Sequence, residues 1–366
     1  MNPRIRFKGE NASEFPDWNC SQIESILTYE RPDRYIVKTK IKSEGKVPVL
    51  TANKSFILGY TDEDDGIYKR GDVIIFDDFT CDCKLVNFSF KVKSSAIKLL
   101  TTDEKQYSLK FVFEAIKRLN IQPKGHQRHW ISFVQKQKLF IPSLEEQQKI
   151  ASFFSTLDQK IELNERKLEV LEKLKKGLMQ KFFKQELRFK SPENRDYPEW
   201  EVQKLEKLCS TFKSGSSITQ KSIFEAGAYP VYGGNGLRGY TDTYTHDGEY
   251  ALIGRQGALC GNLKYVKGKT YISEHAIAVQ ANSENSTQWL YYRLKEMNLN
   301  KLSESSAQPG LSAKKLKEIL INTPCLEEQI RIANFLACFD EQIKLCTNKL
   351  FMLQQLKRSF LRQMFV

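Results

Sequence analysis

Residues 142–183 read PSLEEQQKIASFFSTLDQKIELNERKLEVLEKLKKGLMQKFF, and residues 324–365 repeat this stretch without a gap as PCLEEQIRIANFLACFDEQIKLCTNKLFMLQQLKRSFLRQMF. In both copies apolar residues recur at alternating spacings of three and four, which is typical of the seam of a coiled coil. Each stretch therefore predicts one helix of about 35–40 residues, or roughly 50–60 Å. Ser143 and Glu146 have the spacing of a capping box at the first helix start, whereas Cys325 removes it from the second.

The seam positions predict which residues pack between the two helices. Lone helices of this length would expose their seams, so the simplest arrangement packs each seam against the other. Because the chain runs domain, helix, domain, helix, the second helix must carry the chain back, and the pair is expected to be antiparallel. Two seam lysines, Lys175 and Lys357, either help to fix the register or extend to the solvent. The predicted seam includes Leu157, Ile161, Asn164, Leu168, Leu171, Leu178, Phe339, Ile343, Leu350, Leu353 and Phe360.

The repetition extends beyond the helices at the same offset in the sequence. Arg6-Phe7-Lys8 recurs as Arg188-Phe189-Lys190, and Trp18 recurs as Trp200. A doubled chain predicts a pseudo-twofold molecule. We therefore expect the tail at 353–365 to lie near residues 6–18, because the first helix runs directly into the equivalent segment. The predicted segments are a first domain at 1–142, a helical spacer at 143–186, a second domain at 187–323 and a second spacer at 324–366.

Between the helices the sequence predicts two small mixed α/β domains. Short apolar runs that Gly, Asp and Asn interrupt predict strands, and longer periodic runs predict helices. The two domains have diverged much further than the helices, which favours a common scaffold that carries two different specificities. Expected strands include 34–37, 72–76, 250–253 and 276–279, and expected helices are 107–120 and 287–297.

Charge and composition narrow the class of protein. The 366 residues include 57 Lys and Arg against 44 Asp and Glu, a net charge of +13. This excess favours a nucleic-acid partner over an anionic membrane surface, although a basic protein without either partner has the same composition. The sequence has no apolar run of about 18 residues and no signal peptide, so we expect a cytoplasmic protein without membrane contact. The eight cysteines form no C-x-x-C pair, and we expect reduced, mostly buried thiols.

These residues resemble the specificity subunit of type I restriction–modification enzymes. The helical stretches look like that family's conserved regions, from Pro142-Ser143-Leu144-Glu145-Glu146-Gln147 onward and again from Pro324. The domains resemble its target recognition domains, and the order of the motifs carries the likeness. These motifs are 48–54, Phe76-Asp77-Asp78-Phe79-Thr80, 93–96 and 126–130 in the first domain, and 229–236, Gly239-Tyr240, 252–257 and Ser273-Glu274-His275 in the second.

The resemblance implies a subunit without catalytic residues, bound cofactor or metal. Each domain would read one half of a split site in double-stranded DNA, and the helices would set the distance between the halves. The subunit would also dock two methylation subunits that carry S-adenosylmethionine and flip out the target adenine. Restriction subunits would add translocation and cleavage that need ATP and Mg²⁺.

The residue types around the motifs fit contact with DNA. An asparagine can bridge an adenine edge, an arginine can bind guanine through both its amino groups, and lysines bind phosphates without sequence information. Glycines let the backbone approach a ligand closely, although Gly-Gly-Asn-Gly is also a common hairpin turn. The candidate DNA-binding residues are Asn53, Lys54, Asp77, Asp78, Lys93, Ser94, Lys98, His126, Arg128, Lys213, Gly233, Gly234, Asn235, Gly236, Arg238, Arg255, Gln256 and His275.

Two other functions stay open at this point. Asp33, Glu44 and Lys46 imitate the acid and lysine pattern of metal-dependent nucleases, which arises easily by chance in a highly charged chain. A coiled-coil adaptor with two unrelated ligand domains is the other alternative. His126 and His129 could be a metal pair, but the sequence supplies no carboxylate or thiolate partners nearby, so DNA contact or a structural role is favoured.

Overall fold

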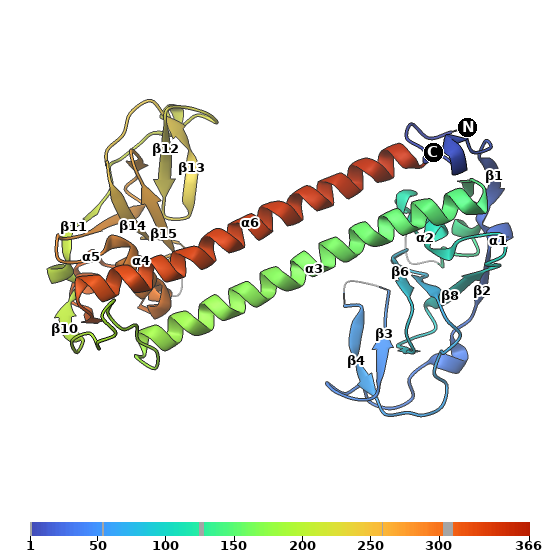
Figure 1. The fold of residues 1–366 in the computed structure, drawn as a ribbon, viewed down its shortest axis with the longest axis horizontal. Coiled ribbons are helices and arrows are strands. Elements are labelled where there is room, and N and C mark those ends of the chain that lie inside the picture. The colour runs from blue at the N-terminus through green and yellow to red at the C-terminus, as the bar shows by residue number, and fades with distance from the viewer. Residues whose placement is uncertain (1, 53–54, 124–127, 258, 303–309) are drawn as a thin grey trace. The chain divides into compact units, whose positions relative to one another are not determined.

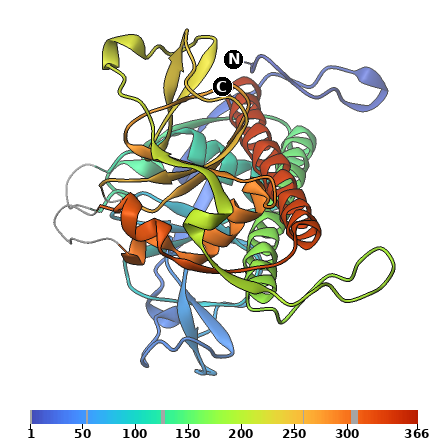
Figure 2. The ribbon, with the colours of Figure 1, turned by 90° about the vertical axis from the view of Figure 1, so that its left-hand side faces the viewer.

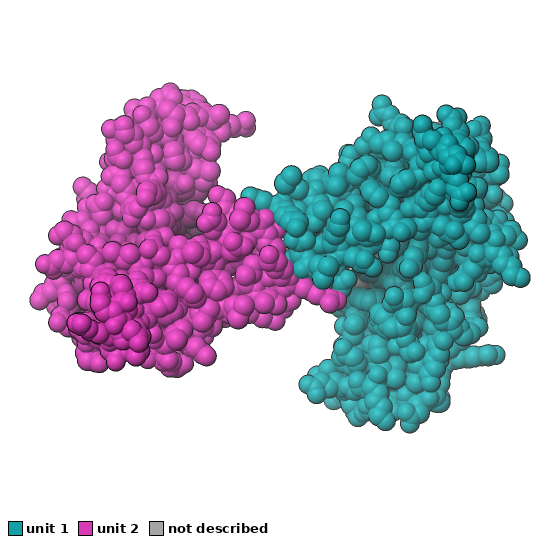
Figure 3. Space-filling model, in the orientation of Figure 1, with its two compact units in different colours: residues 1–165, 348–366 teal, residues 166–347 magenta. Residues whose placement is uncertain are grey.

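The structure is a computed structural model that describes residues 2–52, 55–123, 128–257, 259–302 and 310–366. The chain divides into two compact units, residues 1–165 with 348–366 as unit 1 and residues 166–347 as unit 2 (Figure 3). Each unit combines one mixed α/β domain with parts of two long helices, α3 (Leu144–Phe183) and α6 (Leu326–Met364) (Figure 1). Both helices begin and end close to the bounds of the predicted spacers.

The two helices pair in opposite directions within each unit. In unit 1, Phe153 near the start of α3 contacts Phe360 near the end of α6, with ring centroids 5.0 Å apart. In unit 2, Phe182 at the end of α3 contacts Phe335 near the start of α6 at 5.5 Å. These contacts confirm the antiparallel prediction.

Burial along α3 and α6 follows the predicted seam. Every seam residue is buried or half-buried, whereas neighbours such as Glu165 and Lys167 are exposed. The seam lysines do not extend to the solvent. Lys357 Nζ lies 2.6 Å from Asp158 Oδ1 in unit 1, and Lys175 forms an ion pair with Asp340 in unit 2. Both lysines therefore join the two helices.

The domain of unit 1 contains a four-stranded sheet in the order β2-β8-β5-β6 and a three-stranded sheet in the order β4-β3-β7. Strands β1 and β9 form a separate antiparallel pair where the chain enters and leaves the domain. Helix α2 packs on the larger sheet. The elements are β1 (Asn19–Gln22), α1 (Ile23–Ile26), β2 (Leu27–Glu30), β3 (Val47–Leu50), β4 (Ile57–Thr61), β5 (Val73–Asp77), β6 (Cys83–Val86), β7 (Lys91–Val92), β8 (Ile97–Thr102), α2 (Leu109–Arg118) and β9 (Lys138–Ile141).

The domain of unit 2 repeats this topology. Its larger sheet has the order β11-β17-β14-β15, its smaller sheet has the order β13-β12-β16, and β10 pairs with β18. The two domains therefore share one fold despite their diverged sequences. The elements are β10 (Glu201–Lys204), β11 (Cys209–Ser214), β12 (Tyr229–Gly233), β13 (Gly236–Thr241), β14 (Glu249–Gly254), β15 (Leu263–Lys267), β16 (Tyr271–Ile272), β17 (Ala276–Ala281), α4 (Thr287–Met297), α5 (Ala313–Lys317) and β18 (Leu320–Thr323).

Most of the predicted elements are confirmed. The strands expected at 72–76, 250–253 and 276–279 are β5, β14 and β17, and the two expected helices are α2 and α4. The strand expected at 34–37 is wrong, because Tyr35 N donates to the Pro32 carbonyl and closes a short 3₁₀ turn. All eight cysteines are free as expected, but among them only Cys260 and Cys346 are buried.

The two chain ends meet in unit 1. Ile5 N donates to the Gln363 carbonyl at 3.0 Å, and the rings of Trp18 and Phe365 lie 6.3 Å apart. Figures 1 and 2 show the two termini side by side near the end of α6. The expectation that the tail lies near residues 6–18 is confirmed.

Candidate nucleic-acid interface

A glycine-rich hairpin turn forms the centre of the candidate interface in unit 2. Gly233 of β12 pairs with Gly236 of β13, and Gly236 has a φ of 102°, which favours glycine. A Cβ on Gly234 would lie 2.7 Å from the His275 carbonyl oxygen. The run is thus a hairpin turn, and its glycines also let it pack closely on the neighbouring backbone. Asn235 is exposed at the tip.

Arg255 and His275 lie next to this turn. Arg255 N donates to the His275 carbonyl at 3.0 Å, and a Cβ on Gly254 would collide with the Gly234 carbonyl oxygen. The Arg255 guanidinium donates to Ser214 Oγ at 3.3 Å and stays exposed. The fold thus brings predicted residues from three separate segments together on one exposed surface.

The other predicted residues of unit 2 are also exposed. Arg238 donates to Gln220 Oε1 at 3.3 Å, and its side chain lies over the backbone of Gly233. Gln256 and Lys213 are exposed as well. Arg238, Gln256 and Lys213 can therefore be reached by a ligand from the solvent.

The equivalent surface of unit 1 is described only in part. Lys93 N donates to the Leu50 carbonyl at 3.0 Å, which places Lys93 and Ser94 beside the end of β3. Lys93, Ser94 and Arg128 are exposed. Three predicted residues, Asn53, Lys54 and His126, lie outside the described residues.

The prediction that Asp78 and Lys98 contact DNA is wrong in this structure, because both side chains are buried. Asp78 Oδ2 lies 3.2 Å from Lys98 Nζ, and the two side chains are 1% and 2% exposed. Asp78 Oδ1 also accepts from Trp130 N at 2.7 Å, and its carbonyl accepts from His129 Nδ1 at 2.9 Å. Asp78 and Lys98 hold the loop before β9 onto the larger sheet and cannot reach a base or a phosphate.

Asp77 is likewise used inside the fold. Its Oδ1 accepts from the backbone N–H groups of Phe79 and Thr80 at 2.9 and 3.0 Å, and the residue is buried. The side chain stabilises the turn after β5 and has no free acceptor facing the solvent at that oxygen. Like Asp78 and Lys98, Asp77 is used in the fold of its own domain in this structure.

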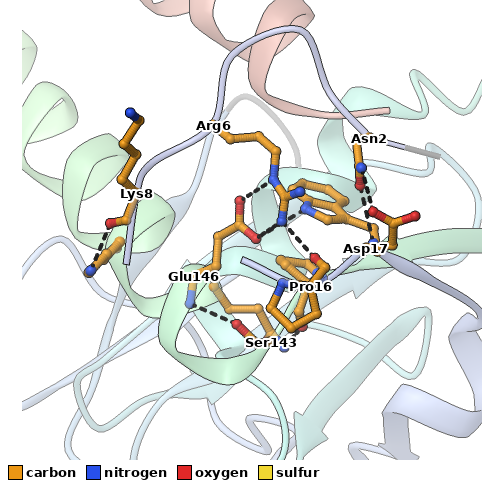
Figure 4. A network of polar contacts seen from close by, with 11 residues as sticks. Asn2, Arg6, Lys8, Pro16, Asp17, Ser143 and Glu146 are labelled. Atoms are coloured by element: carbon orange, nitrogen blue, oxygen red, sulfur yellow. Dashed lines mark hydrogen bonds and ion pairs between the residues drawn. The ribbon is translucent and has the colours of Figure 1, made fainter. Parts of the chain in front are cut away.

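A buried arginine–glutamate contact at the start of each long helix was missed by the sequence reasoning. Arg6 Nη2 lies 2.7 Å from Glu146 Oε2, and Trp18 Nε1 donates to the same oxygen at 3.2 Å (Figure 4). Hydrogen bonding to Glu146 raises the pKa of Arg6. Because the Glu146 carboxylate is engaged here, only half of the capping box forms, with Ser143 Oγ accepting from Glu146 N at 3.5 Å.

Unit 2 repeats this contact with Arg188, Glu328 and Trp200. Arg188 Nη2 lies 2.9 Å from Glu328 Oε2, and Trp200 Nε1 donates to that oxygen at 3.1 Å. The signal in the sequence was the recurrence of arginine, tryptophan and glutamate at the single offset that relates the two copies. The contact closes each domain against the start of a long helix.

Exposed apolar side chains along the two long helices form a second feature, and they lie outside the predicted seam. Leu163, at 63% exposure, is an example on α3, and Met352, at 68%, is one on α6. Large apolar side chains at this exposure favour a protein partner over solvent. Several of them on α3 recur at equivalent positions of α6, namely Leu163, Val170 and Leu174 with Leu345, Met352 and Leu356.

The described residues give no support to a metal-dependent nuclease. Asp33 Oδ2 lies 3.2 Å from Arg31 Nε, and Lys46 N donates to Asp62 Oδ1. Across the described ranges, no group of three or more His, Cys, Asp or Glu side chains is placed to hold a metal ion. Nor does any described helix combine the length and the apolar character needed to cross a membrane.

The sequence matches the type I restriction modification DNA specificity domain twice, over residues 16–173 and 197–355. The chain belongs to this family of DNA sequence-recognition subunits of type I restriction–modification systems. Each match covers one copy of the domain and most of the long helix that follows it.

Individual relatives agree with this assignment. The chain is 45% identical over 132 residues to the specificity subunit of the type I restriction enzyme EcoprrI from Escherichia coli, which covers 35% of this chain and 33% of that protein. It is 25% identical over 393 residues to the MjaVIII specificity subunit from Methanocaldococcus jannaschii, covering 93% and 91%. The first of these matches spans about a third of the length of the relative.

A solved structure shares the fold. The type I restriction–modification S subunit from M. genitalium matches with a TM-score of 0.79 at 20% identity, over 100% of this chain and 99% of that one. The likeness covers both domains and both long helices.

Proposed function

We propose that this subunit reads a bipartite site in double-stranded DNA, one half with each mixed domain. The observation that carries the proposal is one strand framework that occurs twice and exposes different side chains at equivalent loops. Arg255 after β14 of unit 2 is exposed, whereas Asp78, which makes the equivalent backbone hydrogen bond after β5 of unit 1, is buried. After β7 unit 1 exposes Lys93, whereas the equivalent residue after β16 of unit 2 is the buried Ser273. Different side chains on one framework are what two unlike half-sites require.

We propose further that the chain itself does no bond chemistry. Helices α3 and α6 act as the spacer between the half-sites and dock two methylation subunits that carry S-adenosylmethionine. Restriction subunits with ATP and Mg²⁺ join the same assembly. The recurrence of exposed apolar residues such as Leu163 and Leu345 at equivalent places on the two helices supports two equivalent docking surfaces.

A domain transplant tests the bipartite reading. Strand β1 pairs Asn19 with Ile141, and β10 pairs Glu201 with Thr323, so both domains enter and leave at equivalent residues. We expect a chain in which 201–323 replaces 19–141 to fold and to direct methylation to an inverted repeat of one half-site. Mapping methylated adenines genome-wide in a host that carries the original or the transplanted gene measures this.

Two results would contradict the proposal. Transplanted complexes that methylate the original asymmetric sequence would show that the domains do not carry the half-sites. Purified chain that cuts plasmid DNA with Mg²⁺, and stops cutting after Glu44→Ala, would establish the nuclease instead.

A further inference from the structure

Each domain has a cavity directly beside its candidate reading loop. In unit 2 a cavity of about 250 Å³ is lined by the turn at 233–236, by 261–264 and by the end of α4 with Lys295 and Asn298. In unit 1 a cavity of about 360 Å³ is lined by Ala52, by 80–84 and by the end of α2 with Lys117 and Asn120. The same three structural elements therefore line both cavities.

The side chains that line the two cavities also correspond. Lys84 is the second residue of β6 and Lys264 the second residue of β15, the two strands that occupy the same place in the two larger sheets. The preceding turns share an unusual backbone, because Cys81 has a φ of 60° and Gly261 a φ of 84°. The strand lysine was thus retained together with the shape of its turn.

The ends of the two domain helices match in the same way. Lys117 Nζ lies 5.1 Å from the Phe113 ring centroid, and Lys295 Nζ lies 5.4 Å from the Tyr291 ring centroid. Asn120 follows α2 with a φ of 46°, and Asn298 follows α4 with a φ of 53°. Two lysines and one asparagine from equivalent positions therefore line each cavity.

Helix termination explains only part of this set. A lysine in the last turn and a left-handed asparagine after it both suit the end of a helix. They do not explain the strand lysines, Lys84 and Lys264, which come from another element and line the same cavities. Two lysines that converge from separate elements favour a negatively charged ligand.

We propose that each cavity binds one phosphate group of the DNA backbone beside the bases that its reading loop contacts. The proposal rests on the proposed function, because the neighbouring loop is what makes DNA the source of the phosphate. Lysine contributes a compact charge that suits phosphate and carries no sequence information. The unit 2 cavity contains no carboxylate among its described lining residues, whereas Asp82 lines the cavity of unit 1, so the cavity of unit 2 is the stronger of the two.

The test uses the subunit assembled with its methylation subunits and a duplex that contains its site. Affinity is measured between about 50 and 200 mM salt for wild type and for Lys264→Gln with Lys295→Gln. The matched control is Lys207→Gln with Lys269→Gln, two exposed lysines that do not line the cavity. Binding of inorganic phosphate to the same proteins is measured by calorimetry.

We expect the cavity variant to bind about tenfold more weakly at low salt and its salt slope to fall by about one. The loss of affinity should be equal for specific and scrambled duplexes. The set of methylated sequences and the melting temperature of the complex should stay unchanged. A cavity variant that matches the control in affinity and slope overturns the proposal. A cavity variant that no longer binds inorganic phosphate but keeps its DNA affinity also overturns the proposal, because the cavity would then bind a small free anion. Wild-type complex without salt-dependent DNA binding would instead remove the proposed function itself.

Discussion

Replacing Lys357 by methionine should destabilise unit 1 more than the equivalent change at Lys175 destabilises unit 2. Lys357 Nζ lies 2.6 and 2.7 Å from the two Asp158 oxygens and 3.3 Å from Glu114 Oε1. The Glu114 side chain is 6% exposed and the Asp158 side chain 47% exposed. Methionine would leave Glu114 buried without its counter-charge, whereas Asp158 can turn to water.

The size of the effect follows from this difference in burial. Removing one partner of a buried ion pair costs about 3–5 kcal/mol, and a solvent-exposed pair contributes about 0–1 kcal/mol. We expect about 3 kcal/mol for Lys357→Met. Lys175→Met should cost about 1 kcal/mol, because Asp340 is 44% exposed and keeps the hydroxyl of Tyr292 as a donor at 2.6 Å.

Amide hydrogen exchange of α2 and α4 measures the two units separately within one protein. We expect exchange in α2 to accelerate about a hundredfold in Lys357→Met, and exchange in α4 to accelerate about fivefold in Lys175→Met. Adding Glu114→Gln to Lys357→Met should recover most of the loss, because the stranded charge is removed. Equal effects of the two lysine variants, or no recovery by Glu114→Gln, would refute the reasoning.

Three further changes have defined outcomes. Hydrogen bonding to the ammonium of Lys91 lowers the pKa of Glu63 to about 2. Glu63→Gln should therefore destabilise the protein fully above about pH 4.5, and the difference from wild type should shrink as the pH falls toward 2. Denaturant midpoints of both proteins, compared from pH 7 to 3, measure this difference. Gly234→Ala should displace the turn from the His275 carbonyl and reduce DNA affinity at least tenfold, with unit 2 still folded by circular dichroism. Glu146→Gln should cost about 2 kcal/mol, measured by denaturant unfolding, because the guanidinium at this carboxylate loses its counter-charge.

The long helices could be predicted from sequence because their pattern is local. A seam at alternating spacings of three and four constrains every turn of α3 and α6, and the burial of Leu157 or Ile343 follows from position alone. For the glycine turn, Arg255 and His275, the sequence showed residue types that suit DNA contact but not that these residues lie close together. They meet because the turn after β12 packs on the end of β14 and on the residue before β17, which no local spacing encodes.

The buried pair of Asp78 and Lys98 shows where such reasoning fails. A charged residue at the end of an apolar strand has the same local signal whether it faces DNA or a partner inside the fold. The pairing of β5 with β8 places Phe76 opposite Lys98, and β8 is buried on both faces over its first four residues. Only the register of two strands that are well separated in the sequence shows that this lysine neutralises an acid in its own domain.

The spacing between equivalent residues of the two copies shows how the loops of the two domains can differ while the contacts of the long helices stay the same. Gln147 Oε1 accepts from Ser108 N at 2.8 Å, and Gln329 Oε1 accepts from Ser286 N at 2.8 Å. The two serines are closer together in the sequence than the two glutamines, so the loops of the domains have absorbed a change in length that the helix contacts have not. Surface loops tolerate such changes at little cost in free energy. If each domain reads one half-site as proposed, changes confined to loops outside these hydrogen bonds should be enough for a new half-site.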